Sequence, residues 1–354
     1  MVLNRDAVSG LDAGRTGSAA RRSRPPPNRA EVSAARRARS GTSTGWVSFA
    51  YARRMSEARR DAPAPTLDIH YGDNLEIIGG FPDESFDLIY IDPPFNTGKK
   101  QARTQIRTVR DDEGDRTGFK GQRYRTVRVG MKAFADNFDD FLAFLEPRLE
   151  EAFRLLKPTG SFFLHLDYRE IHYAKILLDG IFGRESFINE IIWAYDYGAR
   201  SRSKWSAKHD NILWYAKDPK NYTYRYDDID RIPYMAPGLV TKEKAERGKT
   251  PTDTWWHTIV SPNGKEKTGY PTQKPLGVIN RIVRVHSNPG DRLLDFFAGS
   301  GTLGESAVRM DRNCVLVDNN DEAIRVMSKR LAFATPRLHG CDRLDFEPQV
   351  DLPD

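Results

Sequence analysis

The 354-residue sequence contains only two cysteines and no long apolar run. Cys314 and Cys341 form no C-x-x-C pair, which argues against a disulfide framework or a zinc site, so we expect no metal and a reducing, cytoplasmic location. No segment approaches the roughly 18 consecutive apolar residues that a membrane-spanning helix needs, and the N-terminus lacks the apolar segment of a secretory signal. We therefore expect no membrane partner.

The net charge of +6 is distributed unevenly along the chain. Residues 1–62 contain thirteen arginines, no lysine and five acidic residues, a net of +8, so the remainder carries −2. This stretch is rich in Arg, Ala, Ser, Gly and Pro, and we expect it to be a disordered basic leader. Two interpretations stay open: a basic arm that grips phosphate, or a segment preceding the true translation start at Met55.

Short apolar runs alternate with amphipathic segments, which predicts an α/β fold. The apolar runs predict buried strands at 66–71, 87–91, 161–166, 188–195, 211–215, 291–297 and 314–317. Apolar residues at helical spacing predict helices at 75–80, 139–157, 168–181, 275–286 and 321–333. We expect Asp73 or Asn74 to cap the first helix, and His165 to be a hydrogen-bonded core residue within its strand.

The stretch 88–96, Leu-Ile-Tyr-Ile-Asp-Pro-Pro-Phe-Asn, organises the rest of the chain. The apolar run predicts a buried parallel strand, and Pro93 and Pro94 stiffen the turn after it. Asp92 and Phe95 are therefore presented at the carboxyl end of a strand, where open α/β sheets bind ligands. A carboxylate, a prolyl carbonyl and an aromatic ring suit a planar amine, while an ordinary turn is the simpler alternative.

Two segments of basic residues predict contacts with nucleic acid. Residues 97–135 are longer than a normal connection between a strand and a helix, and we interpret them as a basic loop beside Asp92. Residues 196–270 interleave basic and aromatic side chains, as a surface that contacts bases and phosphates would. A solvated loop and a self-packing insertion are the alternatives. The candidate DNA-binding residues are Lys99, Lys100, Arg103, Arg200, Arg202 and Lys204.

A glycine-rich turn follows the predicted strand at 291–297. Residues 299–304, Gly-Ser-Gly-Thr-Leu-Gly, match G-x-G-x-x-G, and Asp318 lies at the end of the next strand. These features alone are compatible with a nicotinamide-dependent dehydrogenase. A dehydrogenase explains neither the turn Asp92-Pro-Pro-Phe95 nor the basic segment that follows it. A DNA-binding protein without catalytic activity is a third class, which predicts DNA affinity without turnover.

Three motifs together resemble the β group of DNA amino-methyltransferases that use S-adenosylmethionine: Asp92-Pro-Pro-Phe95, Thr272-Gln-Lys-Pro275 and Asp295-Phe-Phe-Ala-Gly-Ser-Gly-Thr302. The catalytic region is also similar to type III modification subunits. The resemblance implies a Rossmann-like methyltransferase fold with a mostly parallel seven-stranded sheet, one antiparallel strand, helices on both faces and circularly permuted motif order. It divides the chain into a catalytic half at 63–195, a target-recognition region at 196–270, a cofactor-binding half at 271–336 and a tail at 337–354.

The resemblance also implies roles for individual residues. Phe297, Gly299 and Gly301 would line the methionine part of the cofactor, Asp318 would bind its ribose, and Asp73 its adenine amine. Asp295, or Lys274 and Thr272, would meet its amino and carboxylate ends. The implied cofactor-binding set is Asp73, Thr272, Lys274, Asp295, Phe297, Ala298, Gly299, Ser300, Gly301, Thr302 and Asp318, and the implied catalytic set is Asp92, Pro93, Pro94 and Phe95.

The implied reaction is methyl transfer to the exocyclic amine of a base flipped out of double-stranded DNA. Asp92 at the head of its motif is similar to the adenine-N6 members, whereas the cytosine-N4 members more often have Ser there. Phe95 replaces the more usual Tyr and keeps the stacking surface. A homodimer and a cognate restriction endonuclease are the partners that the resemblance adds to DNA.

Overall fold

The computed structural model describes residues 64–94, 99–110, 116–117, 123–136, 140–198, 200–261, 263–342 and 344. The chain divides into residues 1–63 and 64–354, and all described residues belong to the second unit. The predicted basic leader at 1–62 and Phe95 lie outside the described residues. No helix in the described ranges is long and apolar enough to cross a membrane.

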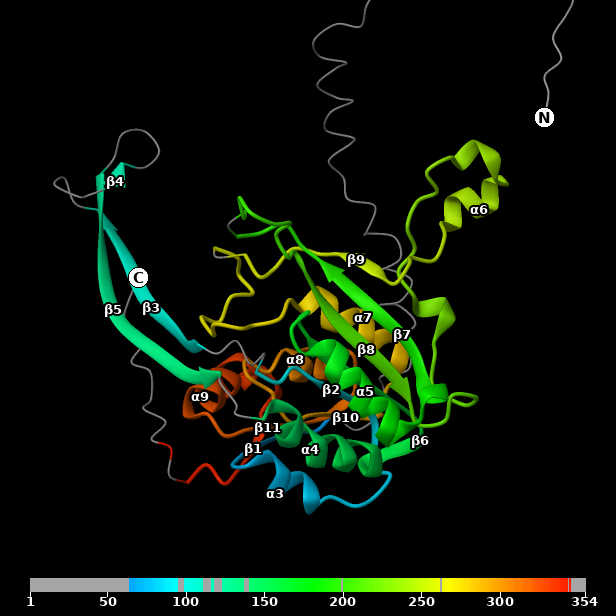
Figure 1. The fold of residues 1–354 in the computed structure, drawn as a ribbon, viewed down its shortest axis with the longest axis horizontal. Helices are drawn as coiled ribbons and strands as arrows, with labels where there is room; N and C mark the ends of the chain where they lie inside the picture. Colours follow the sequence, from blue (N-terminus) through cyan, green and yellow to red (C-terminus); the bar gives the residue numbers. More distant parts are fainter. Residues whose placement is uncertain are drawn as a thin grey trace, which may run out of the picture. The chain divides into compact units, whose positions relative to one another are not determined.

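One large mixed sheet forms the centre of the second unit (Figure 1). Within the described residues it has nine strands in the order β12-β1-β11-β10-β2-β6-β8-β7-β9, and β8 alone runs antiparallel to its neighbours. The predicted mostly parallel α/β sheet is confirmed, with two short edge strands in addition to the seven. The strands are β1 Leu67–Tyr71, β2 Phe86–Ile91, β6 Leu156–Leu166, β7 Phe187–Ala194, β8 His209–Ala216, β9 Thr254–Trp256, β10 Arg292–Asp295, β11 Asn313–Asp318 and β12 Arg337–His339.

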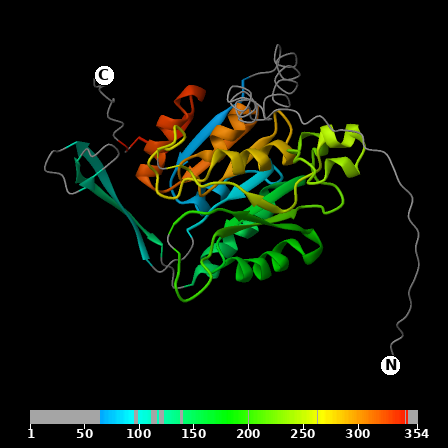
Figure 2. The ribbon, with the colours of Figure 1, turned by 90° about the horizontal axis from the view of Figure 1, so that it is seen from above.

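Helices cover both faces of this sheet, as Figure 2 shows from above. The helices are α3 Asn74–Gly79, α4 Phe141–Leu155, α5 Ile171–Phe182, α6 Lys242–Arg247, α7 Leu276–His286, α8 Thr302–Arg309 and α9 Asp321–Arg330. Apolar residues of α3, α4 and α5 share one buried cluster, and those of α7, α8 and α9 share another. Strand residues alternate between the clusters, so Leu88 and Tyr90 face α7 whereas Ile89 and Ile91 face α4.

The predicted strands and helices are present, with shifted ends. Asp73 caps α3 by accepting the Leu75 N–H at 2.9 Å, as expected. Strand β6 starts at Leu156, several residues before the predicted start, because Leu156 pairs with Phe86 across a β-bulge. His165 is fully buried, and its ring nitrogens contact Tyr90 and Asp210. It is the hydrogen-bonded core residue that we predicted.

Two predicted irregular segments form strands instead. Residues 97–135 were predicted as a loop, but Lys99–Arg110 (β3) pairs antiparallel with Arg123–Asp136 (β5), which also pairs with Arg116–Thr117 (β4). Pairing between β3 and β5 provides hydrogen-bond partners within the segment for backbone groups that a loop would leave to water. Within the predicted tail, β12 pairs with β1, and Asp68 binds both Arg337 at 2.6 Å and His339 at 2.8 Å.

The permuted order of motifs places late residues at the centre of the sheet. β10 lies between β11 and β2, and its register aligns Leu294 with Ile89. The chain leaves β10 through α8 on one face, whereas α4 lies on the other face. The β2–β10 boundary is therefore the topological switch point, at whose carboxyl edge ligands bind in open α/β sheets.

Candidate active site

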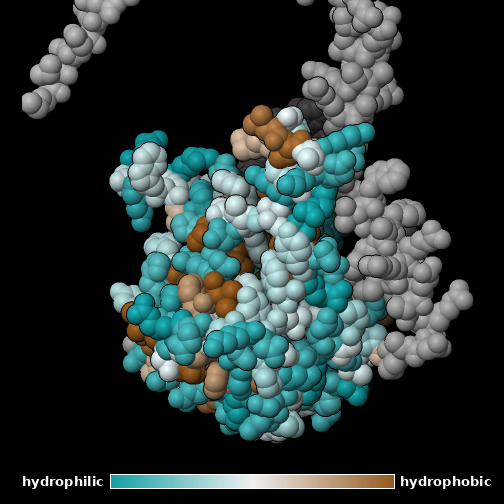
Figure 3. Space-filling view, turned by 90° about the vertical axis from the view of Figure 1, so that its right-hand side faces the viewer, coloured by the Kyte–Doolittle hydropathy of each residue, from teal (hydrophilic) through white to brown (hydrophobic). Residues whose placement is uncertain are grey.

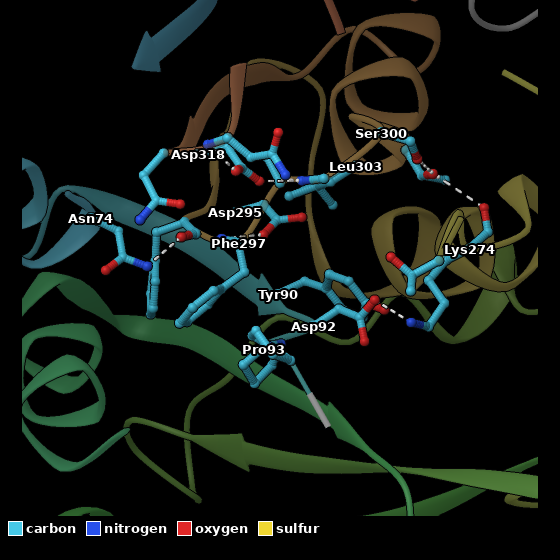
Figure 4. A pocket seen from close by; sticks show the side chains of 18 of the residues that line it. Asn74, Tyr90, Asp92, Pro93, Lys274, Asp295, Phe297, Ser300, Leu303 and Asp318 are labelled. Atoms are coloured by element: carbon cyan, nitrogen blue, oxygen red, sulfur yellow. Dashed lines mark hydrogen bonds and ion pairs between the residues drawn. The ribbon is translucent and has the colours of Figure 1, made fainter. Parts of the chain in front are cut away.

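A pocket of about 370 Å³ opens at the carboxyl ends of β2 and β10 (Figure 4). Its size falls within the range of small-molecule sites. The predicted site residues that line it are Asp73, Asp92, Pro93, Pro94, Thr272, Lys274, Asp295, Phe297, Ala298, Gly299, Ser300, Thr302 and Asp318. Segments more than 180 residues apart in the sequence thus meet at one cavity, since Asp92 and Lys274 are separated by 182 positions.

Asp92 stands at the floor of the pocket, directly after β2. Lys274 donates a hydrogen bond to its Oδ2, and Figure 4 shows the two side chains pointing toward one another. The other oxygen, Oδ1, is buried and has no hydrogen-bond partner among the described residues. A buried carboxylate oxygen without a donor is costly. This atom is therefore ready to accept a hydrogen bond from a ligand.

The glycine turn shapes the wall opposite Asp92. Gly299 has φ +51° and its N–H donates to Asp318 Oδ2 at 2.8 Å. A Cβ on Gly299 would lie 3.1 Å from the Tyr270 ring, so this glycine lets the ring pack against the turn. Gly301 does not line the pocket: it begins α8 with φ +73°, and its Cα faces Met327 in the core. Packing against Met327 thus favours glycine at position 301, and its predicted contact with the cofactor stays a prediction.

Two buried carboxyl groups lie along the glycine turn. Burial raises the pKa of Asp295 well above its usual range, with the Phe297 N–H opposing this shift. Burial also raises the pKa of Asp318 to about 6, although the N–H groups of Gly299 and Asn320 lower it. Desolvation that these hydrogen bonds do not offset favours the neutral acids. A cationic ligand would favour their ionised forms.

A buried polar network closes the far end of the pocket. Arg148 of α4 donates to Asn74 Oδ1 at 2.7 Å, and Asn74 donates to the Phe296 carbonyl at 2.7 Å. Arg148 also lies 3.5 Å from Asp73 and packs over the Phe144 ring. This network joins α3, α4 and the turn after β10. Asp73 therefore both caps its helix and borders the cavity.

Sequence reasoning missed several lining residues: Asn74, Tyr90, Phe144, Arg148, Tyr270, Phe296, Leu303, Asn319 and Asn320. One of them carried a readable signal. Arg148 follows Phe144 by four residues and Leu145 by three, on the apolar face of α4, where an arginine is unusual unless it is paired. Tyr270 precedes the Thr272 motif but lacks such a distinguishing feature.

The predicted DNA-binding residues fall into two groups. Lys99, Lys100 and Arg103 lie on β3, whose side chains are outside the described part of the structure. Arg200, Arg202 and Lys204 are all exposed on the connection between β7 and β8, and Arg200 also pairs with Asp196 at 2.8 Å. Because β7 runs parallel to β2, this connection leaves the sheet at the same edge as Asp92.

The residues around the pocket fit S-adenosylmethionine, a small molecule with a sulfonium, an ammonium and a carboxylate. Four acidic residues and two basic residues line the cavity, and a cationic ligand would favour the ionised forms of the buried carboxyl groups. The aromatic side chains Phe144, Phe297 and Tyr270 supply apolar surface. Asp295, Asp318 and Asp73 are the candidates to hold the polar ends of the cofactor.

A mostly parallel sheet with a glycine turn and an Asp-Pro-Pro corner at its switch point defines a Rossmann-like methyltransferase. The sequence profile of the family described as DNA methylase, of the N6/N4 type, matches residues 86–329. The type II methyltransferase M.HpaI of Haemophilus parainfluenzae is 30% identical over 271 residues, 77% of this chain and 75% of that protein.

One further relative supports the same grouping, and one solved structure supports the fold. The DNA adenine methyltransferase YhdJ of Escherichia coli is 29% identical over 275 residues, 75% of this chain and 83% of that protein. The solved structure of the cytosine-N4-specific PvuII DNA methyltransferase shares the fold, with a TM-score of 0.50 and 15% identity over 78% of this chain and 96% of that chain. The chain belongs to the N6/N4 family of DNA methylases, enzymes that take a methyl group from S-adenosylmethionine.

Proposed function

We propose that this enzyme methylates the N6 amine of an adenine flipped out of double-stranded DNA. The observation that carries the proposal is Asp92 Oδ1, a buried acceptor without a partner among the described residues, on a side chain that lines the pocket that fits the cofactor. The preference for adenine rests on Asp, rather than Ser, at the head of the motif. It is also in accord with the name of the YhdJ relative.

The chemistry requires help because an exocyclic amine has its lone pair delocalised into the ring. Asp92 Oδ1 accepts one amine hydrogen and the Pro93 carbonyl accepts the other, which favours a pyramidal nitrogen with a directed lone pair. S-adenosylmethionine, when bound, supplies a methyl group on a sulfonium. As the nitrogen forms its new bond it loses a proton, for which Asp92 is the adjacent acceptor. Stacking of the base on Phe95 stays a prediction.

The DNA would lie against the carboxyl edge of the sheet. The β7–β8 connection carries Arg202, Lys204 and Trp205, and the Trp205 side chain is 98% exposed. Basic and exposed aromatic side chains at this edge suit phosphates and unstacked bases. Figure 3 shows the face on the right-hand side of Figure 1, where the surface is largely hydrophilic and apolar side chains form separate groups. A homodimer and a partner endonuclease stay predictions.

The test is mass spectrometry of nucleosides from a host that lacks its own DNA methyltransferases. We expect N6-methyladenine with the wild type, none with Asp92→Ala, and wild-type amounts with Glu150→Ala, which removes an exposed carboxylate from α4. N4-methylcytosine in place of N6-methyladenine would overturn the assignment of the base. If methylated bases are absent both from the DNA of the cells and from DNA treated with purified enzyme and cofactor, the proposal is overturned.

A further inference from the structure

Lys274 is held rigidly at the start of α7, although no regular element contains it. The Thr302 hydroxyl donates to the Lys274 carbonyl at 3.1 Å, and Arg330 donates to the same hydroxyl at 2.9 Å. The preceding Gln273 accepts the Thr268 N–H at 2.8 Å and donates to the Glu266 carbonyl at 2.8 Å. The backbone around Lys274 is therefore fixed to the turn that forms the cofactor wall.

The Lys274 side chain is directed at the proposed catalytic acid. The Lys274 and Asp92 side chains are only 10% and 14% exposed, and Nζ contacts Oδ2 alone among the two carboxylate oxygens of Asp92. The other oxygen, Oδ1, stays buried without a partner among the described residues. Lys274 thus binds one oxygen of the Asp92 carboxylate and leaves the other oxygen available to a ligand.

Other charges around Lys274 favour this placement. The carboxylates of Asp210 and Asp295 interact electrostatically with Lys274. Asp210 is itself fixed by the Tyr195 hydroxyl at 3.0 Å and by His165 at 3.3 Å. Lys274 therefore lies among acids on the β2 side of the pocket, where the proposed target amine would enter.

We propose that Lys274 is a positioning residue for Asp92 and not a ligand of the cofactor carboxylate. By binding Oδ2 it fixes the rotation of the Asp92 carboxylate, so that Oδ1 faces the incoming amine. This inference rests on the proposed methyl transfer and assigns a different role to Lys274 than the sequence resemblance implies.

The experiment compares wild-type enzyme with Lys274→Met, Lys274→Gln and the control Lys265→Met, which removes an exposed lysine from the same connecting segment. Calorimetry gives the Kd for S-adenosylhomocysteine, and single-turnover assays with saturating cofactor and DNA give the methyl-transfer rate. We expect both Lys274 variants to bind S-adenosylhomocysteine with a Kd within about threefold of wild type. Their methyl-transfer rate should be roughly 10- to 100-fold lower, because one charge-assisted hydrogen bond to Asp92 is lost.

The comparison of the Kd with the methyl-transfer rate separates positioning of Asp92 from a merely structural role of Lys274. Loss of the structure around Lys274 would weaken cofactor binding as well as slow the reaction, whereas loss of Asp92 positioning alone slows the reaction and leaves the Kd within about threefold of wild type. A Kd raised tenfold or more, with an unchanged rate at saturating cofactor, would show that Lys274 binds the cofactor and would overturn the inference. A wild-type enzyme that binds cofactor but transfers no methyl group would instead overturn the proposed function, and this inference with it.

Discussion

The pKa of Asp318 predicts that cofactor binding depends on pH near neutrality. Burial raises this pKa to about 6, against the opposing N–H groups of Gly299 and Asn320. We expect the ionised carboxylate to accept the ribose hydroxyls, so ligand binding favours the deprotonated form. At pH 5 about one-tenth of the side chains would be ionised, and nearly all at pH 8, so affinity should weaken about tenfold between pH 8 and pH 5.

The assay is calorimetry with S-adenosylhomocysteine, which carries the ribose but no sulfonium charge. Titrations in buffers of different ionisation enthalpy also count protons, and near pH 6 about half a proton should be released per ligand bound. Asp318→Asn removes the titrating group, so the variant should bind the ligand more weakly and should lose the part of the pH dependence that Asp318 causes. Equal pH dependence in wild type and variant, or tighter wild-type binding at pH 5, would refute the reasoning.

Three further predictions concern stability and DNA. Gly301→Ala places a Cβ 2.8 Å from Met327 at a residue with φ +73°, so it should lower the free energy of unfolding by about 2–4 kcal/mol. Gly180→Ala places its Cβ where no atom lies within 4 Å, so it should raise the free energy of unfolding by about 0.5–1 kcal/mol. Urea unfolding measures both changes. Trp205→Ala should change stability by less than about 0.5 kcal/mol but weaken DNA binding roughly 5- to 100-fold in anisotropy titrations. Arg148→Met should cost about 1.5–3 kcal/mol in thermal unfolding and also weaken binding of S-adenosylhomocysteine, and an unchanged melting temperature would contradict its bridging role.

The elements that could be predicted are those whose signals lie within a few neighbouring residues. The apolar run before Asp92 and the two prolines after it define a strand and its end without reference to the rest of the chain. The same holds for α7, whose predicted range of 275–286 differs from the observed Leu276–His286 by one residue. Local hydrophobic period and capping chemistry are sufficient there.

The elements that were missed depend on partners far away in the sequence. β12 has three exposed residues and becomes a strand because Asp68 and its neighbours in β1 offer an open edge. The ribbon of β3 and β5 has no clean alternation of apolar and polar residues, so its charge suggested a loop. The direction of the Lys274 side chain likewise follows from Thr302 and Asp92, which a local pattern does not contain.

The central place of β10 has a consequence for how the enzyme matures during synthesis. Strands β1 and β2 are synthesised early, but the two strands that lie between them in the sheet, β11 and β10, emerge roughly 200 residues later. Such distant pairing slows folding, because a long loop must close before its contacts form. An incomplete chain on the ribosome therefore lacks the wall of the cofactor pocket that the glycine turn and Asp318 form. We therefore expect the nascent protein to be inactive until β11 has been translated, and chains truncated before β11 should neither bind the cofactor nor methylate DNA.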